Sequence, residues 1–151
     1  MIATNESVLT DAFTDAIVAL TPRLVFKGAE SWKPYKRGDS GPTRTRRFRI
    51  LWDAGNIQPR GAMAGHVIEH YATCRVRTDY AGEHAEQQHV IIDDFHQIGD
   101  ALTMLKDSSD ANGLIVVERL QPQEVFGEID DTDVVRIDHT YNVRFMRSIR
   151  P

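Results

Sequence analysis

The chain has 151 residues, of which 26% are charged and 41% are apolar, and its formal net charge is −4. These values are typical of one globular domain, residues 1–151, with enough apolar material for a core that needs no covalent staple. The single cysteine, Cys74, excludes an internal disulfide and any multi-cysteine zinc site. No secretory leader and no apolar run of about 18 residues is present, so we expect no membrane segment and synthesis in a cytoplasm.

The net charge conceals an asymmetry along the chain. Residues 1–80 contain 12 Lys and Arg against 8 Asp and Glu, whereas residues 81–151 contain 6 against 14. Such polarity can orient subunits head to tail. The alternative is that opposite charges interleave on one surface. Net acidity also argues against a general nucleic-acid binder, which usually has a basic excess.

The N-terminal region predicts an amphipathic helix from Thr4 to Leu20. Its apolar stripe consists of Leu9, Phe13, Ile17 and Leu20, which share one helical face. Thr4, Asn5 or Ser7 can cap its start, and Pro22 stops it. The short apolar run at residues 24–26 predicts a first strand.

Three later stretches predict long strands: Thr43–Trp52, Val67–Tyr80 and Val134–Arg147. Each alternates apolar and polar residues, so one face is buried while the other is exposed to solvent or contacts a partner. Two of the runs span about 14 residues, above the usual strand length of about 5–6. We expect such strands to extend past their own core, which favours function by surface contact. Cys74 falls on an apolar side, where a small buried hydrophobe is favoured over a reactive thiol.

Two segments predict long, flexible loops. Residues 27–42 are rich in Gly, Pro, Ser and Lys, and they include Trp32 and Tyr35. These two rings either dock onto a partner or pack back onto the domain, with stacking on nucleic acid as a third alternative. Residues 53–65 connect the first two long strands, which predicts a hairpin with an extended tip.

The second half predicts a helix over Glu86–Lys106, strands over Leu114–Leu120 and Val125–Ile129, and an acidic turn before the last long strand. The apolar stripe of this helix consists of Ile91, Phe95, Ile98, Leu102 and Leu105. The expected fold class is therefore α+β: a mainly antiparallel sheet with a long hairpin, flanked by an N-terminal helix and one central helix.

No motif predicts a catalytic centre, and we expect no enzyme activity, cofactor or metal. The segment His66-Val67-Ile68-Glu69-His70 has the spacing of an inverted zincin. In a strand, however, its two histidines would be about 13 Å apart, too far for one metal ion. We interpret the other histidines as surface residues, with His139 as a core histidine, and the acidic residues 130–133 as a solvated turn.

The strongest interaction signal is a set of arginines on the predicted hairpin. It comprises Arg44, Arg46, Arg47, Arg49, Arg75 and Arg77. Arginine pairs in a bidentate manner with carboxylates and with phosphates. Because the net charge is negative, we favour protein contact over DNA.

The order of these elements resembles the tail terminator (tail completion) proteins of long-tailed bacteriophages and related tail-like particles. The resemblance covers an N-terminal helix, an arginine-bearing hairpin, one helix over Glu86–Lys106 and the closing strand Val134–Phe145. The segment Lys27–Pro42 falls outside it. The resemblance implies a homohexameric ring in the virion, at the neck, that caps the tail tube, ends tail polymerisation and meets head-completion or connector proteins. Genome DNA would only pass through its lumen.

Under this hypothesis the contact residues to neighbouring subunits or the tube are the six arginines above. The docking elements are Trp32, Tyr35 and the hairpin tip with Asn56, Ile57, Arg60 and Met63. The alternatives are a head–tail connector, neck or other tail subunit, a small zinc-dependent or ligand-binding α+β protein, and a nucleic-acid binder that uses the arginines.

Overall fold

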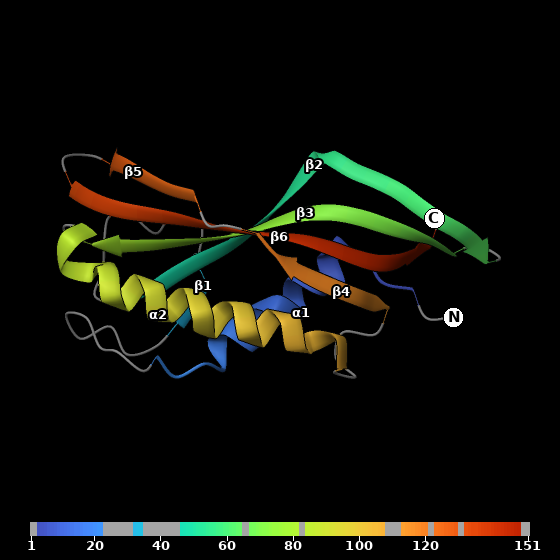
Figure 1. Ribbon diagram of the computed structural model, residues 1–151, viewed down its shortest axis with the longest axis horizontal. Helices are drawn as coiled ribbons and strands as arrows, with labels where there is room; N and C mark the ends of the chain where they lie inside the picture. Colours follow the sequence, from blue (N-terminus) through green and yellow to red (C-terminus); the bar gives the residue numbers. More distant parts are fainter. Residues whose placement is uncertain are drawn as a thin grey trace.

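The computed structural model describes residues 3–22, 32–34, 46–64, 67–81, 84–107, 113–120, 123–129 and 132–148. Within these ranges the chain forms two layers, with both α-helices against one face of a 6-stranded sheet (Figure 1). The elements are α1 (Glu6–Val18), β1 (Trp32–Pro34), β2 (Arg46–Ala64), β3 (Val67–Ala81), α2 (His84–Thr103), a 3-10 helix (Met104–Asp107), β4 (Leu114–Arg119), β5 (Gln123–Ile129) and β6 (Thr132–Ser148). The α+β class is therefore confirmed.

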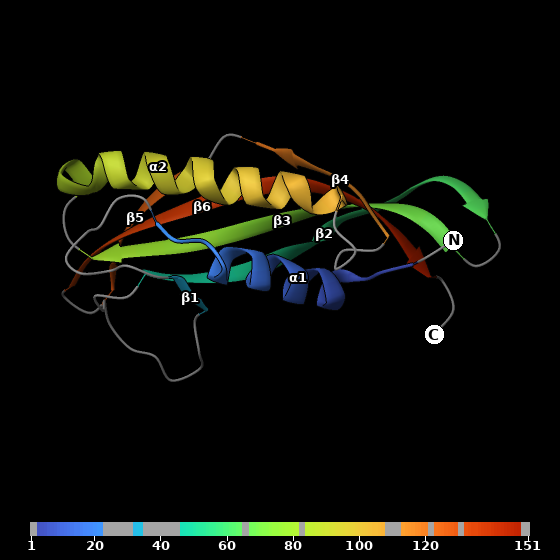
Figure 2. The same cartoon turned by 90° about the horizontal axis from the view of Figure 1, so that it is seen from below.

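The sheet is mainly antiparallel, as the sequence predicts. Its order is β1-β2-β3-β6-β4, and β5 also pairs with β6. Only the short pairing of β1 with β2 is parallel among the described strands. The centre of the sheet is the long antiparallel pair of β3 and β6, whose register runs from Val67↔Ser148 to Ala81↔Val134. Figure 2 shows α1 and α2 next to each other across the covered face.

The β2–β3 hairpin is longer than the sequence predicts. The prediction of a loop over residues 53–65 is wrong for residues 53–64, because β2 continues to Ala64 and pairs with β3. Register shifts between Asp53 and Gln58 and between Arg60 and Ala64 absorb extra residues in β2, as bulges do. β1 covers β2 only at residues 46–48, so Pro59 lies where β3 is the only described neighbour of β2, and edge strands tolerate proline.

The prediction for residues 27–42 is also corrected in part. Trp32–Pro34 forms β1 instead of loop, because its backbone pairs with Arg46, Arg47 and Phe48 of β2. The rest of that segment and the predicted strand at residues 24–26 lie outside the described residues.

Both predicted helices are confirmed, with shifted ends. Asn5 caps α1, and its Oδ1 accepts a hydrogen bond from the Val8 amide at 2.9 Å. Thr4 instead joins the sheet, where its amide donates to the Met146 carbonyl at 2.7 Å. The helix α2 starts at His84, two residues before the prediction. It buries Val90, Ile91, Ile98 and Leu102 against the sheet.

A buried polar cluster ties α2 to three strands. The Arg46 guanidinium on β2 pairs with the Asp94 carboxylate on α2, and both side chains are almost fully buried. The Tyr80 hydroxyl on β3 donates to the other Asp94 oxygen at 2.9 Å. The ring centroid of Trp32 on β1 lies 5.8 Å from the guanidinium carbon of Arg46, and the ring packs edge-on against Phe48 and Tyr80. Burial raises the pKa of Asp94 to about 6, while Arg46 and Tyr80 oppose that rise.

This cluster makes a testable stability prediction. Asp94→Ala leaves the Arg46 charge buried without its carboxylate, which costs about 3–5 kcal/mol of unfolding free energy. Asp100→Ala is the matched control on the same helix, because it removes an exposed partner of Arg119 and costs less than about 1 kcal/mol. Urea unfolding of both variants measures the difference. Equal losses would contradict the anchoring role of Asp94.

Two residues expected in the core are confirmed there. Cys74 is fully buried on β3, and burial raises the pKa of its thiol, so the small-hydrophobe interpretation holds. His139 is fully buried on β6, where its Nε2 lies 3.1 Å from the Thr78 hydroxyl. Burial lowers the pKa of His139 from 6.5 to about 4.

The depressed pKa of His139 predicts a pH dependence of stability. Because the pKa of His139 falls on folding, its contribution to the unfolding free energy is complete at pH values above its unfolded pKa of 6.5. This contribution is lost progressively as the pH falls from 6.5 towards about 4. At about pH 5 the loss amounts to about 2 kcal/mol. The raised pKa of Asp94 has the opposite sign over the same range, so the comparison needs a variant.

The variant His139→Gln isolates this effect. We expect the stability difference between wild type and variant to shrink by about 2 kcal/mol between about pH 7.5 and about pH 5, because glutamine does not titrate. Urea unfolding at both pH values measures the difference. If the difference in unfolding free energy between wild type and His139→Gln is the same at both pH values, His139 does not titrate as its burial implies.

Candidate interaction surface

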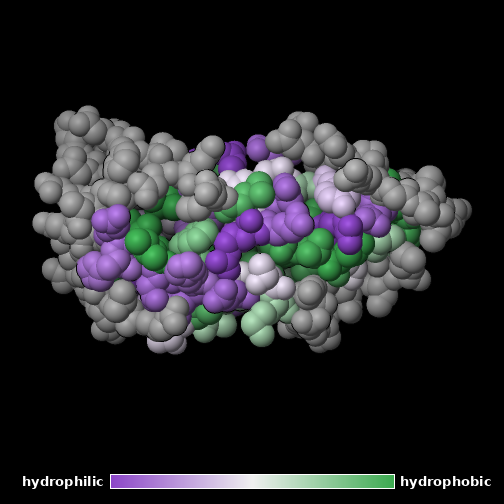
Figure 3. Space-filling model, in the orientation of Figure 1, coloured by the Kyte–Doolittle hydropathy of each residue, from purple (hydrophilic) through white to green (hydrophobic). Residues whose placement is uncertain are grey.

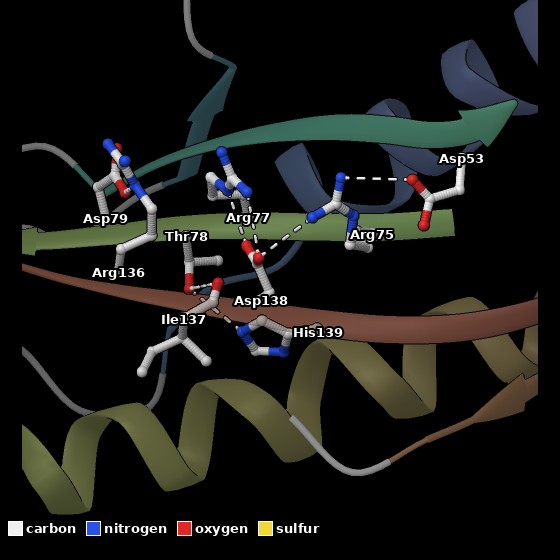
Figure 4. A network of polar contacts seen from close by, with 9 residues as sticks. All are labelled: Asp53, Arg75, Arg77, Thr78, Asp79, Arg136, Ile137, Asp138 and His139. Atoms are coloured by element: carbon white, nitrogen blue, oxygen red, sulfur yellow. Dashed lines mark hydrogen bonds and ion pairs between the residues drawn. The ribbon is translucent and has the colours of Figure 1, made fainter. Parts of the chain in front are cut away.

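Side chains on β2, β3 and β6 that point away from the helices form one contiguous surface, here called the helix-free face. Its membership follows from the strand register, because directly paired residues lie on the same side of a sheet. It comprises Arg47, Arg49, Leu51, Asp53, Glu69, Tyr71, Thr73, Arg75, Arg77, Asp79, Arg136, Asp138, Thr140, Asn142 and Arg144. Figure 4 shows its central residues standing above the strands, opposite His139 and α2.

Asp138 is the centre of this face. Arg77 binds it in a bidentate manner, with Nε 2.7 Å from Oδ1 and Nη2 3.1 Å from Oδ2. Arg75 approaches the same carboxylate at 3.5 Å. The Asp138 side chain is only 4% exposed, although no described helix covers it. The two guanidinium groups therefore act as its cover (Figure 4).

Further ion pairs extend the pattern along the strands. Arg75 also lies 3.5 Å from Asp53, and Arg136 lies 2.9 Å from Asp79. Towards the other end, Arg144 lies 3.1 Å from Glu69 and donates to the Tyr71 hydroxyl at 3.0 Å. The arginines of β3 and β6 on this face are thus matched by carboxylates of the same chain.

The electrostatics suit binding rather than proton transfer. The hydrogen bond to Asp138 raises the pKa of Arg77, and the hydrogen bond to Tyr71 raises the pKa of Arg144. Both guanidinium groups therefore stay charged at any physiological pH. The face therefore presents a fixed array of guanidinium donors and carboxylate acceptors. Arg77 and Arg144 do not change charge near neutral pH.

The structure brings four of the predicted contact residues together. Arg47, Arg49, Arg75 and Arg77 all lie on the helix-free face. Arg136 and Arg144 were not among the predicted contact residues, although the alternation of the last strand already places them on its wet side. Their carboxylate partners could not be assigned from the sequence, because each pair joins residues on different strands.

Two predicted contact residues are corrected. Arg46 and Trp32 are each only 2% exposed and lie in the cluster beneath α2, so neither is available for surface contact. The reason is strand parity, since Arg46 points to the opposite side from Arg47. Of the alternatives for Trp32, packing onto the domain is the observed one. Arg44 and Tyr35 lie outside the described residues. The side chains of Asn56, Ile57, Arg60 and Met63 also lie outside them, although their backbone belongs to β2.

The histidine motif does not form a zincin-like site in its described part. Glu69 and His70 are consecutive in β3, so they point to opposite faces of the sheet. His70 is buried against Phe145, with ring centroids 5.7 Å apart, and burial lowers its pKa. His66 lies outside the described residues. Among the residues described, no group of three or more His, Cys, Asp or Glu side chains is placed to hold a metal ion.

The central carboxylate makes a testable prediction. Asp138→Asn keeps the shape but removes the charge that Arg75 and Arg77 share, and we expect a loss of about 2–3 kcal/mol in unfolding free energy. Asp53→Asn is the matched control, because its ion pair is long and more exposed, and it costs less than about 1 kcal/mol. Urea unfolding compares the two variants. A larger loss for Asp53→Asn would contradict the central place of Asp138.

Neither of two sequence comparisons relates this chain to a known protein. A scan against protein-family models finds no match, and a search of curated proteins finds no similar sequence. No described helix is long and apolar enough to cross a membrane. The geometry of the helix-free face is therefore the basis for assigning a function.

Proposed function

We propose that this chain is a structural virion protein, a tail terminator that forms a ring on the end of a phage tail tube. In this role it stops tail polymerisation and joins the tail to head-completion or connector proteins at the neck. The observation that carries the proposal is the helix-free face, a long surface on which the arginines of β3 and β6 are already matched by carboxylates of the same chain.

The internal pairing favours a protein partner over DNA. Binding to a phosphate backbone draws its affinity from cations that replace condensed counterions. On this face, Arg75, Arg77, Arg136 and Arg144 already contact Asp53, Asp138, Asp79 and Glu69. A DNA backbone would have to compete with these carboxylates. A protein surface can instead match a pattern of both charges, and such matching excludes wrong partners.

The shape of the sheet also supports a contact role. An antiparallel sheet with helices on one side leaves its second face either to solvent or to a partner. β3 alone has 15 residues, which corresponds to about 50 Å of extended backbone. Paired arginines still offer further N–H donors, because a guanidinium carries five of them. The face therefore provides a long, preorganised platform for neighbouring subunits.

Native mass spectrometry and negative-stain electron microscopy test the proposal, with the chain alone and with a tail tube protein from the same phage. We expect a closed ring, six-fold as the resemblance implies, that sits on tube ends and prevents their growth. A species that stays monomeric and leaves tube growth unaffected would contradict the terminator role. A ring that binds the head connector but ignores the tube would point to a neck subunit.

A further inference from the structure

The two faces of the domain differ in charge. Neither α1 nor α2 contains a lysine or an arginine. Asp11, Asp15 and Asp100 are exposed on these helices, and Asp93 is half-buried. Figure 3, which shares the view of Figure 1, shows hydrophilic residues over most of the described part of α2. Arg119 of β4 pairs with Asp100 at the edge of this layer. The other formally charged side chains described on α1 and α2 are all acidic, and exposed uncharged residues such as Val8 and Ile92 lie on the same helices.

The opposite face carries an arginine block, defined as Arg47 and Arg49 on β2 with Arg75 and Arg77 on β3. Arg49 and Arg77 are directly opposite each other in the β2–β3 register. Like charges in directly opposite positions destabilise a strand pair. Asp138 already occupies two N–H donors of Arg77, so a carboxylate that approaches from outside does not replace it but accepts from donors that remain on the Arg49 and Arg77 guanidinium groups.

The helix-free face carries six described arginines against four carboxylates, whereas α1 and α2 carry carboxylates and no arginine, and this difference does not follow the two halves of the sequence. The acidic surface combines α1, from the basic half of the chain, with α2, from the acidic half. The helices cover one face of the sheet (Figures 1 and 2), and the strand register places the arginine block on the other face, where Figure 4 shows Arg75 and Arg77. A two-fold contact centred on the arginine block would set that block against itself, whereas contact between the arginine block and the helix surface sets arginine against carboxylate.

We infer that the arginine block of one copy docks on the acidic outer surface of α1 and α2 of a second copy. The contact is heterologous, because each copy contributes its arginine block to one neighbour and its helix surface to another. Contacts of this type close into rings or grow into filaments, and do not stop at a two-fold dimer. The inference rests on the proposed function and names the subunit contact within its ring.

A charge-swap experiment tests the contact. The first variant is Arg49→Glu, which places a carboxylate opposite Arg77 and so is compatible with folding. The second is Asp11→Lys with Asp15→Lys, at exposed positions of α1, where a lysine in the last turn also suits the helix dipole. Arg49→Lys and Asp11→Glu with Asp15→Glu are the matched controls that keep each charge.

We expect each swapped variant alone to assemble at least about tenfold more weakly than wild type, because one face now meets a like charge. An equal mixture of the two variants should regain assembly, since the carboxylate introduced by Arg49→Glu then faces the introduced lysines, while the native arginine faces the native aspartates. The controls should assemble as wild type does. Sedimentation velocity over a dilution series at low salt, together with native mass spectrometry, measures the wild type, both swapped variants, their mixture and the controls.

Three results would overturn the inference: a swapped variant that assembles as wild type does, a mixture that stays dissociated, or a wild-type chain that is monomeric throughout the series. Capping of tail tubes, followed by electron microscopy, is scored separately. If wild-type rings cap tubes but the swapped variants assemble normally, or their mixture stays dissociated, only this contact would be overturned. A wild-type chain that assembles as inferred but leaves tubes uncapped would overturn the proposed function alone.

Discussion

The buried pair of Arg46 and Asp94 fixes which face of the sheet is covered. A buried ion pair adds little net stability, because desolvation offsets much of the attraction, but breaking it is costly. Through this pair, with Tyr80 on the same carboxylate, α2 is held against β2 and β3. Shifting the strand register by one residue would exchange the two faces, so the pair also determines that Arg47 points away from the helices.

Much of the fold could be predicted from periodicity. The spacing of apolar residues gives both helices, and alternation gives β3 and β6 with the correct buried side, including His139. The extension of β2 could not be predicted, because Gly55, Pro59 and Gly61 are local turn signals that pairing with β3 overrides.

The contact surface was predictable in part. The alternation of strand residues places Arg47 and Arg49 on the face opposite to Phe48. Applied strictly, the same alternation also predicts that Arg46 lies on the buried side. The i, i+4 spacing of Val90, Asp94 and Ile98 likewise places Asp94 on the buried side of α2. The partner of each buried or paired charge lies on a distant strand or helix, and single-sequence patterns do not contain such pairings. The central role of Asp138 therefore required the structure.

Under the proposed function, the helix-free face is buried between proteins in the assembled state. Hydroxyl-radical footprinting before and after assembly tests it most directly, because Tyr71 and Leu51 are oxidisable side chains on that face and are partly exposed in the single chain. We expect the oxidation of both residues to fall when the ring forms. Unchanged oxidation of both in a fully formed assembly would contradict it.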